Sequence, residues 1–283
     1  MILVPATQLL QEAKAGKYAV GAFNYNGLED FQALLMASDE TRLPFLAMAT
    51  EGAVQYAGVE YLAAIAYAAA KIRTVPFSLN LDHGQHFEVA MQCIRHGFTA
   101  VMFDGSKLPY EENVALTKKV VEVAHAVGVC VEGELGRIGG KEDDLNVKDK
   151  DALLTDPEMA VDFVQCTGID IFAPAIGTAH GFYKGTPNLD FARLEAIHAR
   201  LPNTYLALHG GTGLTDAQFA QAITCGITKI NIGTDLKNTF TSTIRKLLQE
   251  RPNEIDTRKT IGAAREAVKT LASRYLRLFR GWE

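Results

Sequence analysis

Three of the seven histidines stand where they could bind one metal ion. His83, His180 and His209 each follow a different short apolar segment. Three imidazoles that meet at one face and leave a fourth position open are the ligand set of a catalytic zinc ion. Surface or packing roles in helices are expected for His96, His125 and His198, while His86, in the first turn of a helix, is expected to have a structural role or to lie behind the metal ligands. The zinc interpretation therefore depends on a fold that brings the apolar segments together.

Further polar residues follow the apolar segments, about one for each segment. In chain order they are Asn24, Thr50, Asp82, Asp104, Glu132, Glu134, His180, His209 and Asn231. A single residue of this kind is most simply a helix cap or a turn former. Their recurrence after successive segments instead predicts that they converge on one pocket.

The apolar segments have the length and composition of buried β-strands. They are Tyr18–Phe23, Phe45–Ala49, Phe77–Leu81, Ala100–Phe103, Val129–Val131, Ile169–Pro174, Tyr205–Leu208 and Ile227–Ile232. Near-continuous apolar strands are typical of a parallel sheet that is buried on both faces. Amphipathic stretches between them, such as Asn113–Val127, predict helices.

This alternation of strand and helix predicts an α/β fold, a (β/α)₈ TIM barrel that forms a single domain over residues 1–283. An open, doubly wound sheet is the alternative. The tail from Thr239 to Glu283 has helical patterns and lies beyond the eighth unit. We expect these extra C-terminal helices to pack on the barrel or on another subunit.

Glycine-bearing loops after the last two strands predict a phosphate site. The loops are His209–Gly213 and Asn231–Asp235. The loops after strands seven and eight are the usual phosphate site of such barrels, because backbone N–H groups beside a helix N-terminus bind anions. Either loop alone could be an ordinary tight turn. A third loop, Gly177–Gly181, is followed by the cationic Lys184.

The segment Glu132–Asp144 places glycines around several acidic residues. Such a composition is expected for a flexible loop that can carry a carboxylate into a site. A solvated acidic loop without a function is the alternative interpretation.

Charge and composition exclude several classes of function. The chain has 283 residues with 28 basic and 33 acidic side chains, which gives a net charge of −5. This balance argues against non-specific nucleic-acid binding, which relies on basic residues. No apolar run reaches the roughly 18 residues that span a bilayer, and no signal peptide is recognised at the start. Four scattered cysteines fit reduced thiols, so we expect a cytoplasmic protein.

Five segments in order resemble the class II, zinc-dependent ketose-bisphosphate aldolases, a family that contains fructose-1,6-bisphosphate and tagatose-1,6-bisphosphate aldolases. They are L-D-H-G at 81–84, E-L-G-R-I-G-G-x-E-D-D at 134–144, I-G-T-A-H-G at 176–181, L-H-G-G-T-G at 208–213 and K-I-N-I-G-T at 229–234. The resemblance extends to about Arg265. It implies a (β/α)₈ barrel, a homodimer or homotetramer, and a lyase of carbohydrate metabolism such as glycolysis.

The resemblance also implies roles for the metal-site residues. His83, His180 and His209 match the zinc ligands, and Asp104 and Glu134 match carboxylates that support the metal or an alternate metal position. Asp82 matches the acid/base at the C4 hydroxyl. Glu142 matches the loop carboxylate that exchanges the proton on the dihydroxyacetone phosphate carbon.

A second group of residues matches the substrate site of the family. Residues that match the dihydroxyacetone phosphate half are Gly181, Lys184, Gly210, Gly211, Thr212, Asn231, Gly233 and Thr234. A monovalent cation, Na⁺ or K⁺, is expected near that phosphate. Asn24 and Thr50 match polar residues close to the substrate. Arg258 matches a basic residue that reaches the distal phosphate, in some members from the neighbouring subunit, although Thr257 replaces a frequent proline before it.

The expected reaction is reversible cleavage of a ketose 1,6-bisphosphate to dihydroxyacetone phosphate and glyceraldehyde 3-phosphate. A zinc ion would stabilise the charge that develops on the C2 oxygen. The motif wording and Gly233 favour the tagatose branch over the fructose branch, and a deoxy-sugar acid phosphate or a C6-sulfonated sugar is an alternative substrate. A metal-dependent hydrolase and a non-catalytic phospho-sugar-binding barrel are the competing functions. A Schiff-base aldolase would need a lysine at a strand end, and Lys229 is the one reservation.

Overall fold

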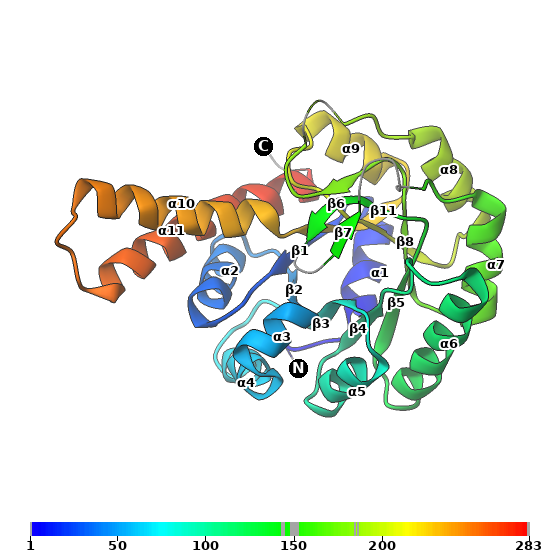
Figure 1. The fold of residues 1–283 in the computed structure, drawn as a ribbon, viewed down its shortest axis with the longest axis horizontal. Coiled ribbons are helices and arrows are strands. Elements are labelled where there is room, and N and C mark those ends of the chain that lie inside the picture. The colour runs from blue at the N-terminus through cyan, green and yellow to red at the C-terminus, as the bar shows by residue number, and fades with distance from the viewer. Residues whose placement is uncertain (1, 143–144, 148–152, 184, 186, 282–283) are drawn as a thin grey trace.

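The computed structural model describes residues 2–142, 145–147, 153–183, 185 and 187–281. Parallel strands close into a barrel in the order β1-β11-β10-β8-β5-β4-β3-β2 (Figure 1). Their bounds are β1 Val20–Asn24, β2 Phe45–Thr50, β3 Phe77–Gly84, β4 Ala100–Phe103, β5 Cys130–Leu135, β8 Ile171–Pro174, β10 Tyr205–Leu208 and β11 Ile227–Ile232. Each overlaps a predicted strand. The barrel prediction is confirmed, and the open-sheet alternative is wrong.

The barrel strands are buried along almost their whole length, as near-continuous apolar runs require. Large aromatic side chains such as Phe45, Phe77 and Phe172 fill the layer between the barrel and its helices. Register places the last residues of neighbouring strands side by side, and Thr50 on β2 is opposite Asp82 on β3. Side chains at the strand ends therefore face one common region.

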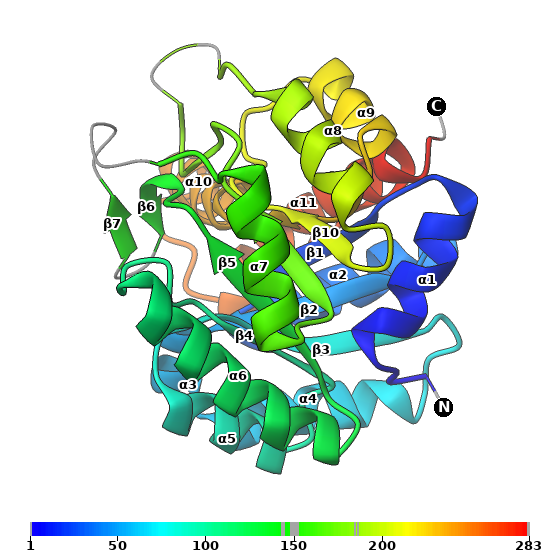
Figure 2. The ribbon, with the colours of Figure 1, turned by 90° about the vertical axis from the view of Figure 1, so that its right-hand side faces the viewer.

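Helices surround the barrel (Figure 1). Their bounds are α1 Ala6–Gly16, α2 Leu28–Thr41, α3 Glu51–Ala57, α4 Val59–Ala70, α5 Phe87–Arg95, α6 Tyr110–Ala126, α7 Pro157–Thr167, α8 Phe191–Arg200, α9 Asp216–Thr224, α10 Thr234–Glu250 and α11 Thr257–Arg280. The predicted helix at 113–127 corresponds to α6. Leu9, Leu10 and Ala13 of α1 pack with inward residues such as Val20 and Ala207. Helix α1 thus closes the end of the barrel opposite β6 and β7 (Figure 2).

Helices α10 and α11 form an antiparallel arm whose turn projects away from the barrel (Figure 1). The sequence pattern predicts a helical tail from Thr239 that lies beyond the eighth unit. Helix α10 instead begins at Thr234, directly after β11, so it is the helix of the eighth unit and only α11 is additional. The last turns of α11 pack on the barrel layer, where Tyr275 and Phe279 contact Phe219.

A second, smaller sheet lies at the carboxyl end of the barrel strands and was not predicted. It consists of β6 Gly139–Glu142, β7 Leu145–Val147 and β9 Ala179–His180. β6 pairs with β7 antiparallel and with β9 parallel. Glycine-rich, short segments of this kind carry no alternating apolar pattern, so the sequence gives little indication of a strand.

None of the described helices is long and apolar enough to cross a membrane.

Candidate active site

The three predicted histidines meet at the carboxyl end of the barrel. His83 is the second-last residue of β3, His180 lies on β9, and His209 follows β10. The ring centroid of His83 is 4.8 Å from that of His180 and 4.7 Å from that of His209. One nitrogen from each ring lies within 4.8 Å of the other two. The fold therefore brings together three imidazoles from distant parts of the sequence.

Carboxylates behind two of the rings fix which nitrogens point inward. Nδ1 of His83 lies 2.8 Å from Oδ2 of Asp104, and Nε2 of His209 lies 2.7 Å from Oε1 of Glu132. When these nitrogens donate to the carboxylates, the lone pairs remain on Nε2 of His83 and Nδ1 of His209. Those two atoms face each other at 3.1 Å. Two lone pairs that face each other repel unless a cation lies between them. The two nitrogens are therefore suited to bind a metal ion.

Protonation of two of the histidines, His180 and His209, is opposed by their surroundings. Burial lowers the pKa of His180 well below its usual value, and the neighbouring His83 and His209 lower it further. Burial also lowers the pKa of His209, against the opposing effect of Glu132. Neutral imidazole is the form that binds metal ions. His180 and His209 are therefore in the ligand form at neutral pH.

A second group of possible ligands overlaps the first. His83, Asp104 and Glu134 each place an atom within 4.8 Å of the other two, and all three are buried. Oε2 of Glu134 has no hydrogen-bond partner among the described residues and lies 3.6 Å from Nδ1 of His209. Burial and then the charge of Asp104 raise the pKa of Glu134 well above its usual value. A cation here would satisfy that carboxylate.

A local distortion allows Asp82 and His83 to face the same site, although they are adjacent on a strand. Successive side chains of a regular strand point to opposite faces. The register of β3 against β4 shifts between Leu81 and Gly84, and His83 has φ +48°. A left-handed backbone is unfavourable for a non-glycine residue and concentrates at functional sites. The bulge turns both side chains inward, where Asp82 is 2% and His83 3% exposed.

Two asparagines hold the carboxylate of Asp82. Nδ2 of Asn24 donates to Oδ2 at 2.8 Å, and Nδ2 of Asn231 donates to Oδ1 at 3.2 Å. The amide oxygens of both asparagines are buried and have no hydrogen-bond partner within the described residues. They can therefore accept hydrogen bonds from hydroxyl groups of a substrate. The carboxylate itself has a fixed orientation next to His83.

Glu132 connects the histidine cluster to a buried lysine. Nζ of Lys229 lies 2.7 Å from Oε2 of Glu132, whose other oxygen contacts His209. Burial by itself raises the pKa of Glu132, but the charge of Lys229 and the bond from His209 outweigh it and lower the pKa to about 2. Asp104 behaves in the same way. Burial by itself raises its pKa, but the interactions with His83 and Ser106 outweigh burial, so that the pKa of Asp104 is lowered. Both carboxylates are ionised at neutral pH.

The glycine-bearing loops line one small pocket. The residues around it are His180, Gly181, Gly210, Gly211, Thr212, Asn231, Gly233 and Thr234. A side chain at position 210 would be excluded, because Gly210 has φ +66° and a Cβ there would lie 2.6 Å from the Ala179 carbonyl oxygen. Helix α10 begins at Thr234, and helix N-termini favour anions. All the predicted phosphate residues converge here except Lys184, which lies outside the described residues.

Tyr183 ties two of these loops together. Its hydroxyl donates to the carbonyl oxygen of Gly210 at 2.8 Å and accepts from the backbone N–H of Ala179 at 2.9 Å. Between the loops His209–Gly213 and Asn231–Asp235, Oγ1 of Thr212 accepts from the N–H of Asp235 at 3.2 Å. The pocket therefore has connected walls.

The acidic segment reaches the site through the small sheet. Gly140 pairs with His180, and a Cβ at Gly140 would lie 2.0 Å from the His180 carbonyl oxygen. Glu142 is two residues further along β6. The backbone of the segment is thus next to a histidine of the cluster, although the structure describes nothing of the Glu142 side chain.

Thr50 and Arg258 differ from the other predicted site residues. Thr50 is buried beside Asp82, and its hydroxyl accepts from the N–H of Ala53 as the cap of α3. Thr50 therefore also serves as the cap of this helix. Arg258 is 89% exposed in its side chain, pairs with Asp256, and lies at the turn of the projecting arm (Figure 1). Within one chain it is not brought to the other site residues.

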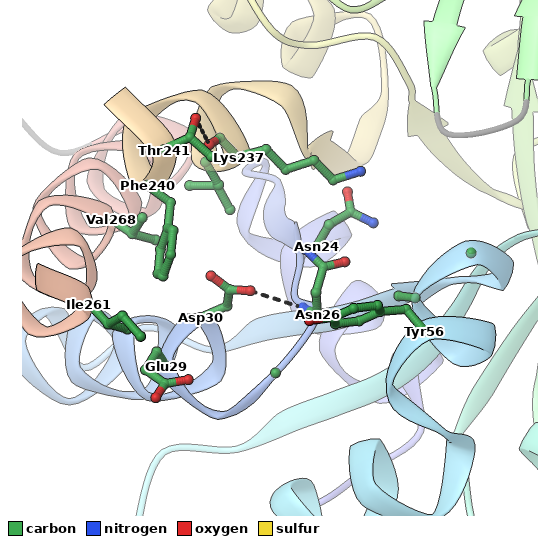
Figure 3. A pocket seen from close by; sticks show the side chains of 14 residues that line it. Asn24, Asn26, Glu29, Asp30, Tyr56, Lys237, Phe240, Thr241, Ile261 and Val268 are labelled. Atoms are coloured by element: carbon green, nitrogen blue, oxygen red, sulfur yellow. Dashed lines mark hydrogen bonds between the residues drawn. The ribbon is translucent and has the colours of Figure 1, made fainter. Parts of the chain in front are cut away.

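A larger cavity of about 780 Å³ adjoins the site at Asn24. It lies among α2, α3, α10 and α11, and Figure 3 shows the side chains of Lys237, Asp30, Tyr56 and Phe240 around it. Most of the residues around this cavity lie outside the strand ends from which the site was predicted.

Several residues of the site were missed in the sequence or given no role. Glu132 was expected only as a polar residue at a strand end; its place beside the histidine cluster could have been inferred because it is two positions from Glu134, so that both side chains lie on the same side of a strand. Lys229 is on the same side of β11 as Asn231 for the same reason. Tyr183 and Lys237 give no comparable signal.

Comparisons with known proteins agree with this geometry. A family model described as "Fructose-bisphosphate aldolase class-II" matches residues 4–282. The fructose-bisphosphate aldolase of Geobacillus stearothermophilus is 44% identical over 283 residues, with 99% of this chain and 97% of that protein covered. The fructose-bisphosphate aldolase of Thermus caldophilus is 42% identical, with 98% of each chain covered.

Solved structures give the same result. The YdjI aldolase from Escherichia coli K12 has a TM-score of 0.86 at 30% identity, with 98% of this chain and 97% of that chain covered. A putative fructose-1,6-bisphosphate aldolase from Coccidioides immitis has a TM-score of 0.88 at 29% identity, with 97% and 95% covered. These relatives favour a lyase over the hydrolase and the non-catalytic barrel. The chain belongs to the class II fructose-bisphosphate aldolase family and is a carbon–carbon lyase.

Proposed function

We propose that this protein catalyses the zinc-dependent, reversible cleavage of a ketose 1,6-bisphosphate to dihydroxyacetone phosphate and glyceraldehyde 3-phosphate. The observation that carries this proposal is the meeting of three histidine nitrogens beside Asp82, at the edge of the glycine-lined pocket. His83, His180 and His209 would hold the zinc ion. Asp104 and Glu134 would support it or provide an alternate position.

The proton of the C4 hydroxyl goes to Asp82 in this proposal. A bound zinc ion supplies Lewis acidity that stabilises the negative charge developing at the C2 oxygen when the C3–C4 bond breaks. Asn24 and Asn231 hold the Asp82 carboxylate from two sides, so its orientation is set before the substrate arrives. Asp82 accepts the proton during cleavage and returns it during condensation.

The phosphate of the dihydroxyacetone half binds in the glycine-lined pocket. Backbone N–H groups of these loops and the N-terminus of α10 favour an anion there. We extend the proposal to Lys184 as a further cation and to Na⁺ or K⁺ near the phosphate.

Glu142 then protonates the C3 carbon of the phosphate-bearing half. Its support is the pairing of β6 with β9, which holds this segment against His180. The same carboxylate removes that proton in the reverse direction.

A second subunit completes the site in this proposal. Because Arg258 lies on the projecting arm of its own chain, the partner's Arg258 would reach the distal phosphate in a homodimer or homotetramer. Ile255 at the same turn is 92% exposed, as expected of an arm tip that packs against another chain.

Fructose and tagatose 1,6-bisphosphate are the two leading substrates. Relatives that are 44% and 42% identical are named fructose-bisphosphate aldolases, which favours fructose. The motif wording favours tagatose. The two sugars differ in the C4 hydroxyl orientation beside Asp82, and both keep the same roles for the residues above.

A substrate panel tests the proposal. Relative kcat/KM is measured for both bisphosphates, a C6-sulfonated ketose 1-phosphate and a deoxy-sugar acid phosphate, with triose phosphate release as the readout. One bisphosphate should be preferred. Absence of triose phosphate from every ketose, together with release of inorganic phosphate, would contradict the proposal and favour a hydrolase.

A further inference from the structure

Strand β5 extends beyond the end of its neighbour β4 beside the histidine cluster. The pairing between the two strands ends at Phe103 and Gly133, while β5 continues to Leu135. Glu134 therefore has no residue of β4 opposite it, although Ala173 of β8 pairs with it on the other side. A buried backbone carbonyl without a partner is costly. The backbone of Glu134 thus depends on a hydrogen-bond donor from outside the barrel sheet.

The side chain of Asn113 on α6 is that donor. Helix α6 packs against β4 and β5, and Nδ2 of Asn113 donates to the carbonyl oxygen of Glu134 at 3.1 Å. Oδ1 of Asn113 accepts from the hydroxyl of Thr117 at 3.0 Å. Asn113 is 1% exposed, and Thr117 is fully buried. Only the amide nitrogen can donate to a carbonyl oxygen, so the bond to Glu134 by itself sets the orientation of the amide.

The same side chain also limits the position of the loop after β4. A Cβ at Gly105 would lie 2.3 Å from Oδ1 of Asn113, so the loop packs this closely only because residue 105 has no side chain. Gly105 follows Asp104, whose Oδ2 lies 2.8 Å from Nδ1 of His83. One buried amide therefore lies against the backbone next to Asp104 and bonds to the backbone of Glu134.

We propose that Asn113 is a positioning residue that fixes the spacing between the carboxylates of Asp104 and Glu134, and thereby the affinity of the site for zinc. This inference rests on the proposed function and deepens it. Asp104 orients His83, and Oε2 of Glu134 lies 3.6 Å from Nδ1 of His209. A shift of either carboxylate changes the surroundings of the histidine nitrogens. Asn113 acts through these two carboxylates.

The test compares zinc binding by Asn113→Ala and Thr117→Val, measured by competition with a chelating dye. Both variants lose a buried hydrogen bond of α6, but only Asn113→Ala frees the Glu134 carbonyl. The dissociation constant for zinc should rise about tenfold or more in Asn113→Ala, the scale of a lost outer-shell partner of a metal site. Thr117→Val should stay within threefold of the wild type.

Gly105→Ala is a second, independent variant, because its methyl group would displace the Asn113 amide. Its zinc affinity should fall as in Asn113→Ala, which keeps the test decisive if Asn113→Ala does not fold. The visible absorption of bound Co²⁺ should also change in Asn113→Ala and Gly105→Ala and not in Thr117→Val. A purely structural role would lower stability and leave the zinc affinity of Asn113→Ala and Gly105→Ala unchanged, which would overturn the proposal. Equal losses of zinc affinity in Asn113→Ala and Thr117→Val would overturn it as well.

Zinc affinity is measured without turnover, so this inference and the proposed reaction can fail separately. If no ketose is cleaved while zinc affinity depends on Asn113, the reaction is wrong and the Asn113 assignment stands. If the wild type cleaves a ketose with zinc, and Asn113→Ala binds zinc as tightly as the wild type, the reaction stands and the Asn113 assignment is wrong.

Discussion

Replacing Lys229 by methionine should destabilise the protein far more than an exposed lysine would. Nζ of Lys229 lies 2.7 Å from Glu132, and the two residues are 1% and 4% exposed. Methionine fills a similar volume but leaves the Glu132 carboxylate without its cation. Breaking a buried ion pair by removing one partner costs about 3–5 kcal/mol. We therefore expect the metal-free Lys229→Met protein to lose about 3 kcal/mol or more of its unfolding free energy.

Removing both charges should restore much of this stability. In Lys229→Met/Glu132→Gln, the amide oxygen can still accept from Nε2 of His209, and no uncompensated charge remains. The double variant should lose less than about 2 kcal/mol, since uncharged replacements of buried pairs are often nearly neutral. Lys246→Met, an exposed replacement, should stay within about 0.5 kcal/mol of the wild type.

Urea unfolding in the presence of a chelator, followed by circular dichroism, measures these differences. The reasoning is refuted if Lys229→Met is as stable as Lys246→Met. It is also refuted if the double variant loses the sum of the two single losses, because coupled partners are not additive.

The remaining predictions concern the proposed acids and the thiols. Asp82→Ala should keep its metal and lose cleavage by about 10²-fold or more, whereas His83→Ala should lower zinc content; the reverse pattern of metal contents would show that the roles are exchanged. Glu142→Ala should suppress the exchange of the C3 proton of dihydroxyacetone phosphate with solvent, whereas Asp82→Ala should largely retain this exchange; deuterium incorporation followed by NMR measures it. Normal exchange in Glu142→Ala would favour the alternative interpretation of this segment as a solvated acidic loop. Iodoacetamide should modify the exposed Cys166 quickly and the three buried cysteines slowly. The reason is that burial raises the pKa of Cys93 to about 12 and the pKa of Cys130 and Cys225 to about 11, which leaves little reactive thiolate. Mass spectrometry that shows several quickly modified cysteines would contradict this prediction.

The barrel and most of the site could be predicted because the strand pattern and the polar residues after each strand are local features. Once eight strands are placed in a barrel, His83, His180 and His209 must share one face. His83 turns toward that face only because β3 has a bulge there, and no residue type in Leu81–Gly84 predicts this bulge.

Contacts across the barrel could not be predicted. Lys229 on β11 and Glu132 on β5 are separated by two strands in the sheet, so only the closed geometry brings them together. Lys237 looks like an ordinary helical lysine until the first turn of α10 is placed beside Asn24. Arg258 matches a site residue by sequence, yet it lies away from the site of its own chain. This separation depends on the direction in which the arm of α10 and α11 projects, which the sequence does not show.

A zinc titration of the metal-free enzyme tests the central claim most directly. Chelator-treated protein receives increasing Zn²⁺ while cleavage of the preferred ketose bisphosphate is followed. The account predicts no cleavage without metal and full recovery at one zinc ion per chain, with little recovery in His209→Ala. Cleavage that is indifferent to chelator, with borohydride trapping the substrate on Lys229 or another lysine, would contradict it.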